Sequence, residues 1–183
     1  MAFLTAALTV LTLLAGPGGD AAAQHPDEYQ VKAAFLFNFA KFVDWPAGAF
    51  AGADGPFTIC VLGNDSFRET LGNTVAGKTV GGHPVAIIPF SEGNQIGACR
   101  MLFVESPGDK HTLSVLNGAG LRSPGMRHGI LTVGDGEGAA GEVIIRFLME
   151  NGKVRFEIDA AAAERAGIHI SAKLLSLAQT RKK

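Results

Sequence analysis

Residues 57–63 read FTICVLG, an apolar run of strand length that ends in turn residues. Apolar side chains at consecutive positions, rather than at alternate ones, indicate a strand covered on both faces, as in parallel sheets. Similar runs recur at residues 83–90, 100–106 and 129–135. Helices are predicted between them at residues 65–72, where Gly72 would end the helix, and from residue 109 to a C-terminus just before Gly118. This alternation predicts an α/β fold with a mostly parallel central sheet flanked by helices.

The last forty or so residues follow a different pattern. Residues 142–159 contain two strand-like runs on either side of Asn151 and Gly152, a pair of residues that favours a tight hairpin turn. A short helix ending at Gly167 should follow, and then a final helix with Ile170, Leu174 and Leu177 on one face. With no repeats or linkers, the chain is predicted to form one domain that ends in a β-hairpin and a helix.

The N-terminus has the pattern of a signal peptide. Residues 3–16 form an apolar run, and the small residues Ala21 and Ala23 follow it in an A-x-A pattern. Cleavage after Ala23 is therefore predicted, with residues 1–23 as signal peptide and 24–183 as the folded α/β domain. A membrane anchor is the alternative, but the run is too short to span a bilayer comfortably. The sequence thus predicts export to the periplasm of a Gram-negative cell.

The composition of the chain argues against nucleic-acid binding and in favour of a disulfide. The chain has 183 residues, enough for one core, and a formal net charge of -1. It carries no basic stripe, so nucleic-acid binding is not expected. Its two cysteines, Cys60 and Cys99, form an even count in an oxidising compartment, which favours one disulfide. Two buried free thiols are the alternative.

The stretch VKAAFLFNFAKFVDWP, residues 31–46, holds four Phe and the single Trp of the chain. We expect a helix that begins near Pro26 and Asp27 and continues to about Val43, because Pro46 restricts the residue before it. Phe35, Phe39 and Phe42 fall on one face, and Lys32, Asn38 and Lys41 leave only a narrow polar strip. Core packing explains most of these aromatic side chains. Phe37 and Trp45 are the candidates for a partner or dimer surface.

The motifs that could carry catalysis are weak. Gly136, Gly138 and Gly141 match a dinucleotide fingerprint, but a strand hairpin rather than a helix is predicted after them, so phosphate binding is not expected. The five histidines, His25, His83, His111, His128 and His169, lie on separate segments without metal-ligand spacing. Glu157 and Asp159 are interpreted as a solvated strand face. We therefore expect no enzyme activity, no metal and no cofactor.

Two binding sites remain possible. If the hairpin lies near the final helix, Arg155, His169 and Lys173 could converge on an anion. A parallel sheet also offers a crevice at the carboxyl ends of its strands, here near Gly63, Asn64, Asp65, Gly134 and Asp135. That crevice would suit a periplasmic receptor for a small ligand.

Four segments together resemble the YfiR family of small periplasmic proteins: residues 29–46, 57–65, 130–135 and 152–178. The most specific parts run from Lys32, Ala33 and Ala34 to Trp45 and Pro46, and from Arg155 to Ser171 and Lys173. The resemblance implies a dimeric repressor that binds the periplasmic sensor domain of an inner-membrane diguanylate cyclase and so lowers cyclic di-GMP and biofilm formation. Cys60 and Cys99 match a cysteine pair of the family. A second pair is missing here, so the remaining bridge is interpreted as structural.

The leading hypothesis from the sequence is therefore a non-catalytic regulator with a membrane protein as its partner. Binding energy would favour the inactive conformation of that partner. The alternative is the small-ligand receptor, and the two could combine if a ligand governs release.

Overall fold

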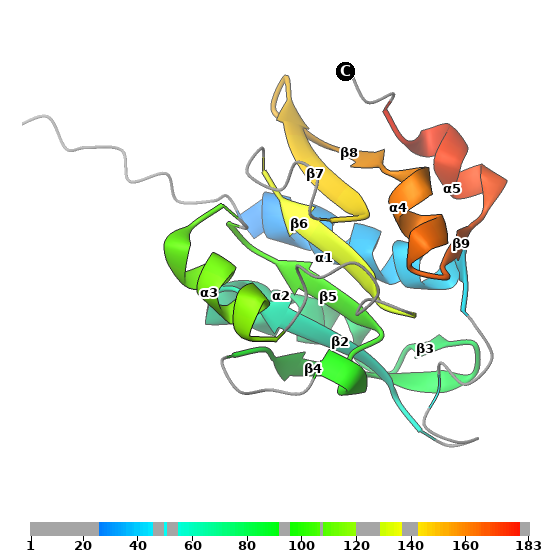
Figure 1. Ribbon diagram of the computed structural model, residues 1–183, viewed down its shortest axis with the longest axis horizontal. Helices are drawn as coiled ribbons and strands as arrows, with labels where there is room; N and C mark the ends of the chain where they lie inside the picture. Colours follow the sequence, from blue (N-terminus) through cyan, green and yellow to red (C-terminus); the bar gives the residue numbers. More distant parts are fainter. Residues whose placement is uncertain are drawn as a thin grey trace, which may run out of the picture.

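The computed structural model describes residues 26–45, 50, 55–91, 96–106, 108–119, 129–136 and 143–179. The predicted signal peptide, residues 1–23, lies outside them. The central sheet consists of β2 (Phe57–Leu62), β3 (Thr79–Val80), β4 (His83–Pro89), β5 (Met101–Val104), β6 (Leu131–Asp135), β7 (Ile145–Glu150) and β8 (Lys153–Ile158). These seven strands lie side by side in the order β3-β4-β2-β5-β6-β7-β8 (Figure 1).

The centre of the sheet is parallel. β2 pairs with β4 and β5, and β6 pairs with β5 and β7, all in parallel register. Only the outer pairs, β3 with β4 and β7 with β8, are antiparallel. The predicted α/β fold with a mostly parallel sheet and a C-terminal hairpin is confirmed.

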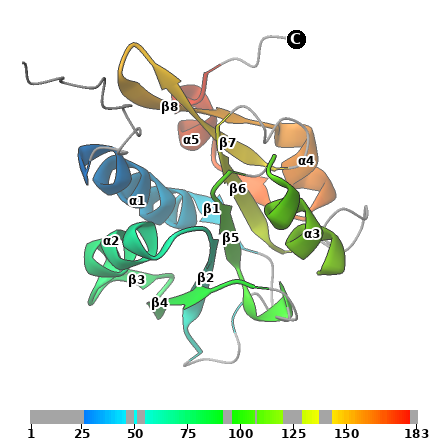
Figure 2. The same cartoon turned by 90° about the vertical axis from the view of Figure 1, so that its left-hand side faces the viewer.

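Helices cover both faces of this sheet. They are α1 (Pro26–Lys41), α2 (Asp65–Val75), α3 (Lys110–Gly118), α4 (Ala160–Arg165) and α5 (Ala172–Leu177), with a single 3-10 turn, η1 (Ile96–Ala98). Figure 2 shows α1 and α2 on one side of the sheet and α3 on the other. Within the described residues, none of these helices has the length and apolarity needed to cross a membrane.

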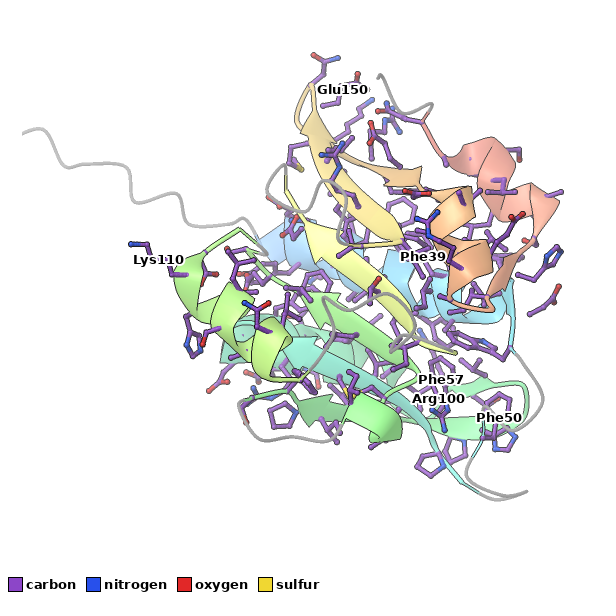
Figure 3. All side chains as sticks on the ribbon, viewed as in Figure 1. Phe39, Phe50, Phe57, Arg100, Lys110 and Glu150 are labelled. Atoms are coloured by element: carbon purple, nitrogen blue, oxygen red, sulfur yellow. A yellow bond between two sulfur atoms is a disulfide. The ribbon has the colours of Figure 1, made fainter. Side chains whose placement is uncertain are left out.

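Aromatic rings of α1 form the centre of the larger core. Phe39 is fully buried, and its ring centroid lies 4.9 Å from that of Phe156 and 5.6 Å from that of Phe147. Figure 3 shows Phe39 in the interior between α1 and the C-terminal hairpin. Phe35 contacts the same two rings, at 5.4 and 6.1 Å. These ring contacts join helix α1, which also packs along α2, to the last two strands of the sheet. The prediction that its aromatic face is core is confirmed for these two residues.

A smaller core lies on the other face of the sheet, under α3. It contains Leu102, Val104, Val115 and Leu116, together with both cysteines. Asp109 caps the N-terminus of α3, because its carboxylate accepts a hydrogen bond from the backbone N–H of Thr112 at 2.8 Å. The hydroxyl of Thr112 also donates to the Asp109 carboxylate, at 2.5 Å. The hydroxyl bond first, and the backbone bond second, lower the pKa of Asp109.

The end of α1 differs from the prediction. The helix ends at Lys41, and Val43 and Asp44 instead form a short strand, β1 (Val43–Asp44). β1 pairs antiparallel with β9 (His169–Ile170), with Val43 opposite Ile170. The prediction of one final helix that includes Ile170 was therefore wrong. Ser171 caps α5, which starts only at Ala172, and Leu177 is 62% exposed rather than packed.

Helix α2 is longer than predicted. It begins after Asn64, whose side-chain oxygen accepts from the N–H of Phe67, and it continues through Gly72 to Val75. The helix tolerates Gly72 because Leu71 and Val75 are both buried against the core. The glycine with a positive φ is Gly77, at φ 69°, two residues after the end. The predicted stop at Gly72 was wrong.

Two tight turns explain how the antiparallel edges form. Asn151 and Gly152 have φ values of 50° and 71° between β7 and β8, as their sequence predicts. Gly81 and Gly82, at φ 59° and 88°, make the same kind of turn between β3 and β4. Most residues with a side chain would be strained at the positive φ values of Gly81 and Gly82.

Candidate functional site

Three strands end beside one another at the proposed crevice. After β2, the chain adds its next strands, β3 and β4, on one side of β2. It then adds β5 and β6 on the other side of β2, so the order in which strands are added reverses between β2 and β5. Ligands of open α/β sheets bind at such a switch point. Asn64, Glu105 and Asp135, at or just beyond the ends of β2, β5 and β6, lie here. We call this region the strand-end crevice.

Glu105 lies at the centre of a hydrogen-bond network that joins three elements. Its carboxylate accepts from the backbone N–H of Asn64 at 2.7 Å and from the Asn64 side-chain amide at 2.8 Å. It also accepts from the Tyr29 hydroxyl of α1 at 3.1 Å. A carboxylate at the N-terminus of α2 is favoured by the helix dipole. The network therefore ties α1, α2 and β5 together and fills the position at which an external anion would meet the α2 N-terminus.

Gly63 makes room for this network. A Cβ atom at this position would lie 2.7 Å from both the Cβ and the Oε2 atoms of Glu105. Real Cβ atoms do not approach other atoms so closely, so any larger residue would displace the Glu105 carboxylate. The glycine that ends the β2 sequence run thus has a specific role in the crevice.

Lys32 is buried beside the crevice, contrary to the prediction that it belongs to the polar strip of α1. It is 1% exposed, and its ammonium group donates to Asp135 at 2.6 Å and also to Glu28. Burial by itself would lower the pKa of Lys32, but the hydrogen bonds to Asp135 and Glu28 outweigh it, so the pKa is raised. The buried charge is retained because two carboxylates surround it.

The pKa of the Tyr29 hydroxyl is also raised by its position in the crevice. Burial raises the pKa of its hydroxyl, the hydrogen bond from Asn64 lowers it, and the Glu105 charge raises it again, with a net increase. Both Tyr29 and Lys32 thus hold their protons more tightly in the folded chain than in the unfolded one.

The pH dependence of stability follows from these two groups. Below their ordinary pKa values, about 10, both groups are protonated in the folded and unfolded states. Their full contribution to the free energy of unfolding is then present. As the pH rises further, the unfolded chain loses these protons first, so the free energy of unfolding is expected to fall. Denaturant unfolding from about pH 8 to about pH 12 measures this decline. Tyr29→Phe should show a shallower decline, and an identical one would contradict the assignment.

Two cavities open along the crevice, with volumes of about 480 and 420 Å³. The larger is lined by Glu105, Asp109 and His111, and the smaller by Glu28, Lys32 and Asp135. Ser106, which has a positive φ of 51°, lines both. The crevice predicted near Gly63, Asn64 and Asp135 is therefore a hollow part of the surface that carries several charged side chains.

Phe37 and Trp45, the predicted docking residues, are both half-buried. The Phe37 ring has the ammonium groups of Lys41 and Lys78 over it, at 5.5 and 4.9 Å from its centroid. The Trp45 ring packs edge-on against Phe57 at 4.9 Å, and its Nε1 donates to the carbonyl of Ala40 at 2.9 Å. Their assignment to a partner or dimer surface remains a prediction.

The predicted anion cluster comes from three separate elements. Arg155 is exposed on β8, His169 is exposed on β9, and Lys173 lies on α5 with its ammonium 5.1 Å from the centre of the Phe42 ring. Among the described residues, no hydrogen bond or ion pair joins these three side chains to one another. Anion binding by this cluster also remains a prediction.

The two carboxylates predicted to form a solvated strand face have structural partners instead. Glu157 is 9% exposed and accepts from Arg146 at 2.6 Å, directly across the β7–β8 pair. Asp159 caps α4 by accepting from the N–H of Ala162 at 2.8 Å. The interpretation of Glu157 as solvated was wrong, because the strand register places Arg146 directly opposite it and the two side chains form a largely buried ion pair.

The disulfide joins Cys60 of β2 to Cys99, which follows η1, with a Cα–Cα distance of 5.6 Å. Both residues are buried, at 0% and 1% exposure. Within the described part of the chain, no group of three or more His, Cys, Asp or Glu side chains is arranged to hold a metal ion.

The remaining motifs are only partly described. His25 and His128 lie outside the described residues, as do residues 137–142 of the glycine motif. The hairpin predicted after that motif is present as β7 and β8. The ring of His83 stacks on Phe50 at 3.9 Å, and its Nδ1 lies 2.7 Å from the carbonyl oxygen of Gly55.

Comparison with known proteins identifies the family of this chain. A family model described as YfiR/HmsC-like matches residues 29–179, which is most of the 183-residue chain. No curated protein matches the chain significantly. The match begins at Tyr29 of the crevice network and ends at Gln179, the last described residue. The chain therefore belongs to the YfiR/HmsC-like family.

Proposed function

We propose that this protein is a periplasmic regulator that represses an inner-membrane signalling protein by binding its periplasmic sensor domain. The observation that carries the proposal is the family match over residues 29–179, because membership suggests a periplasmic regulator in cyclic di-GMP signalling. The partner would be a diguanylate cyclase. The signal peptide at residues 1–23, export of the domain at 24–183 and formation of a homodimer are parts of the same proposal.

Repression requires that the regulator bind two conformations of its partner with different affinities. A regulator lowers the activity of its partner only to the extent that it binds the inactive conformation more tightly than the active one. The buried disulfide and the packing of α1 into the core support a domain that presents a fixed surface rather than one that folds on binding. Phe37 and Trp45 are the candidate residues of that surface, for the partner or for a second copy of the chain.

Deleting the gene is expected to raise cellular cyclic di-GMP, because the repressed cyclase would be released. Complementation with the full chain should restore the original level, and complementation without residues 1–23 should not, since that protein would stay in the cytoplasm. Cyclic di-GMP in extracts of the four strains provides the measurement. An unchanged level in the deletion strain would remove the cyclase as partner.

The strand-end crevice favours a second candidate function, a receptor for a small ligand. Two adjoining cavities at a switch point are the observation behind it. Mass spectrometry of small molecules released from the purified protein, and thermal unfolding with and without them, tests this candidate. A ligand that raises the melting temperature of the wild type but not of a variant with a filled crevice would support it.

A further inference from the structure

Three lysines lie over phenylalanine rings at the end of the molecule where α1 ends. Lys41 and Lys78 share the Phe37 ring, and Lys173 covers the Phe42 ring, which directly follows Lys41 in the chain. The contacts bring together the last turn of α1, the segment before β3 and the start of α5. We call these five residues the lysine–phenylalanine surface.

The three ammonium groups are exposed and available. Lys41, Lys78 and Lys173 are all exposed, and within the described residues none has a carboxylate partner at ion-pair distance. In contrast, Lys32 and Arg146 are buried or half-buried and paired with carboxylates. A lysine over an aromatic face gains only a small stabilisation at an exposed site. It retains its charge and its donors for another molecule.

Charge is distributed unequally between the two ends of the sheet. The strand-end crevice is acidic, since four carboxylates and one lysine line its two cavities: Glu105 and Asp109 line the larger, and Glu28, Asp135 and Lys32 line the smaller. The opposite end carries the three lysines. Arg100, labelled in Figure 3, also lies at that end, since its backbone N–H donates to the carbonyl of Thr58 near the start of β2. Asp44 on β1 is an exposed acidic side chain there and offsets only part of this charge.

From these observations we propose that the lysine–phenylalanine surface binds an acidic segment of a protein partner. The inference rests on the proposed function and adds the chemistry of the partner: carboxylate side chains that pair with Lys41, Lys78 and Lys173. The aromatic rings restrict the lysine side chains before binding, so less conformational entropy is lost when the ion pairs form. Opposite charges also speed association and orient the two proteins.

The surface fits a protein segment better than a bilayer. Proteins that bind at a lipid interface insert protruding apolar side chains among the acyl chains. Here Phe37 and Phe42 are half-buried beneath ammonium groups, and Trp45 is held by its bond to the Ala40 carbonyl. The fixed ammonium groups can instead pair with individual carboxylates of a folded or extended segment.

The test uses binding of the purified mature protein to spheroplasts, which expose the periplasmic face of the inner membrane. Spheroplasts of the deletion strain are used so that the partner is free. Three variants are compared with the wild type: K41Q/K78Q/K173Q removes the charges, K41R/K78R/K173R keeps them, and K110Q/K153Q removes exposed charges elsewhere. Far-UV circular dichroism and Trp45 fluorescence verify that each variant is folded.

The Gln triple variant is expected to bind roughly tenfold more weakly, the combined effect of three exposed ion pairs. The Arg variant and K110Q/K153Q should bind like the wild type, and protease treatment of the spheroplasts should abolish binding. Wild-type affinity in the Gln variant, equal loss in the Arg variant, or no binding by the wild type would overturn the proposal. So would equal binding to protein-free vesicles of phosphatidylglycerol, because the occupant would then be lipid.

Failure here is distinguishable from failure of the proposed function. If deletion raises cyclic di-GMP but the Gln variant binds normally, the regulator stands and this surface does not. If cyclic di-GMP is unchanged while charge-dependent, protease-sensitive binding persists, the surface stands and its partner is not a cyclase.

Discussion

Replacing Lys32 by methionine should lower the free energy of unfolding by about 3–5 kcal/mol, the range for removing one partner of a buried ion pair. Methionine has similar length and fills the same space, so the loss reflects charge rather than a cavity. Asp135 and Glu28 would be left with side chains only 12% and 15% exposed and no cation between them. Urea unfolding followed by Trp45 fluorescence measures the change.

Lys41→Met is the matched control, because it makes the same substitution on the same helix at an exposed position. It should cost no more than about 1 kcal/mol. Adding Asp135→Asn to Lys32→Met should recover part of the loss, since one unpaired carboxylate is then neutral. Equal effects of Lys32→Met and Lys41→Met would mean that the Lys32 cluster contributes nothing to stability.

Removing both cysteines, as Cys60→Ala with Cys99→Ala, should destabilise the chain by roughly 4 kcal/mol on the chain-entropy model. The bridge closes a loop with a sequence separation of 39 and so restricts the unfolded chain. Alanine at both positions avoids leaving a lone thiol. The free energy of unfolding in guanidinium, compared with that of the oxidised wild type, provides the test, and repression of cyclic di-GMP should weaken in parallel.

The reduced wild type is the control for packing. It keeps both sulfur atoms in the smaller core, so it should lose the loop constraint without creating space beside Leu102. If the reduced protein and the oxidised protein unfold at the same denaturant concentration, the bridge has no structural role. If only the alanine variant is destabilised, the sulfur atoms act by packing alone.

The centre of the fold could be predicted because β2, β5 and β6 are each apolar at consecutive positions. The turn at Asn151 and Gly152 carries its own conformational preference, so the hairpin could be predicted as well. Short strands give no such signal: β1, β3 and β9 have two residues each, and only their partners define them. The local preference of Gly72 favours a helix end, but the burial of Leu71 and Val75 on either side of it keeps α2 helical to Val75.

The position of the crevice could be inferred from topology, but its chemistry could not. Lys32 lies 103 residues from Asp135, and Tyr29 lies 76 residues from Glu105. Nothing in the local sequence distinguishes a lysine that will be buried between carboxylates from one on a solvated strip. Only the register of α1 against the sheet decides this, and that register is set by aromatic contacts with strands far along the chain.

Helix α1 depends on partners that come last in the chain. Its core rings pack on Phe147 and Phe156, and the strand that follows it pairs at Val43 with Ile170. A polypeptide that emerges N-terminus first, from a ribosome or through a membrane channel, therefore presents this aromatic helix long before its cover arrives. Until Phe147 and Phe156 arrive, Phe35 and Phe39 lack these two partners and form part of an apolar surface of the kind that chaperones bind. A chain truncated before Phe147 would lack both partner rings for good and is expected to be degraded.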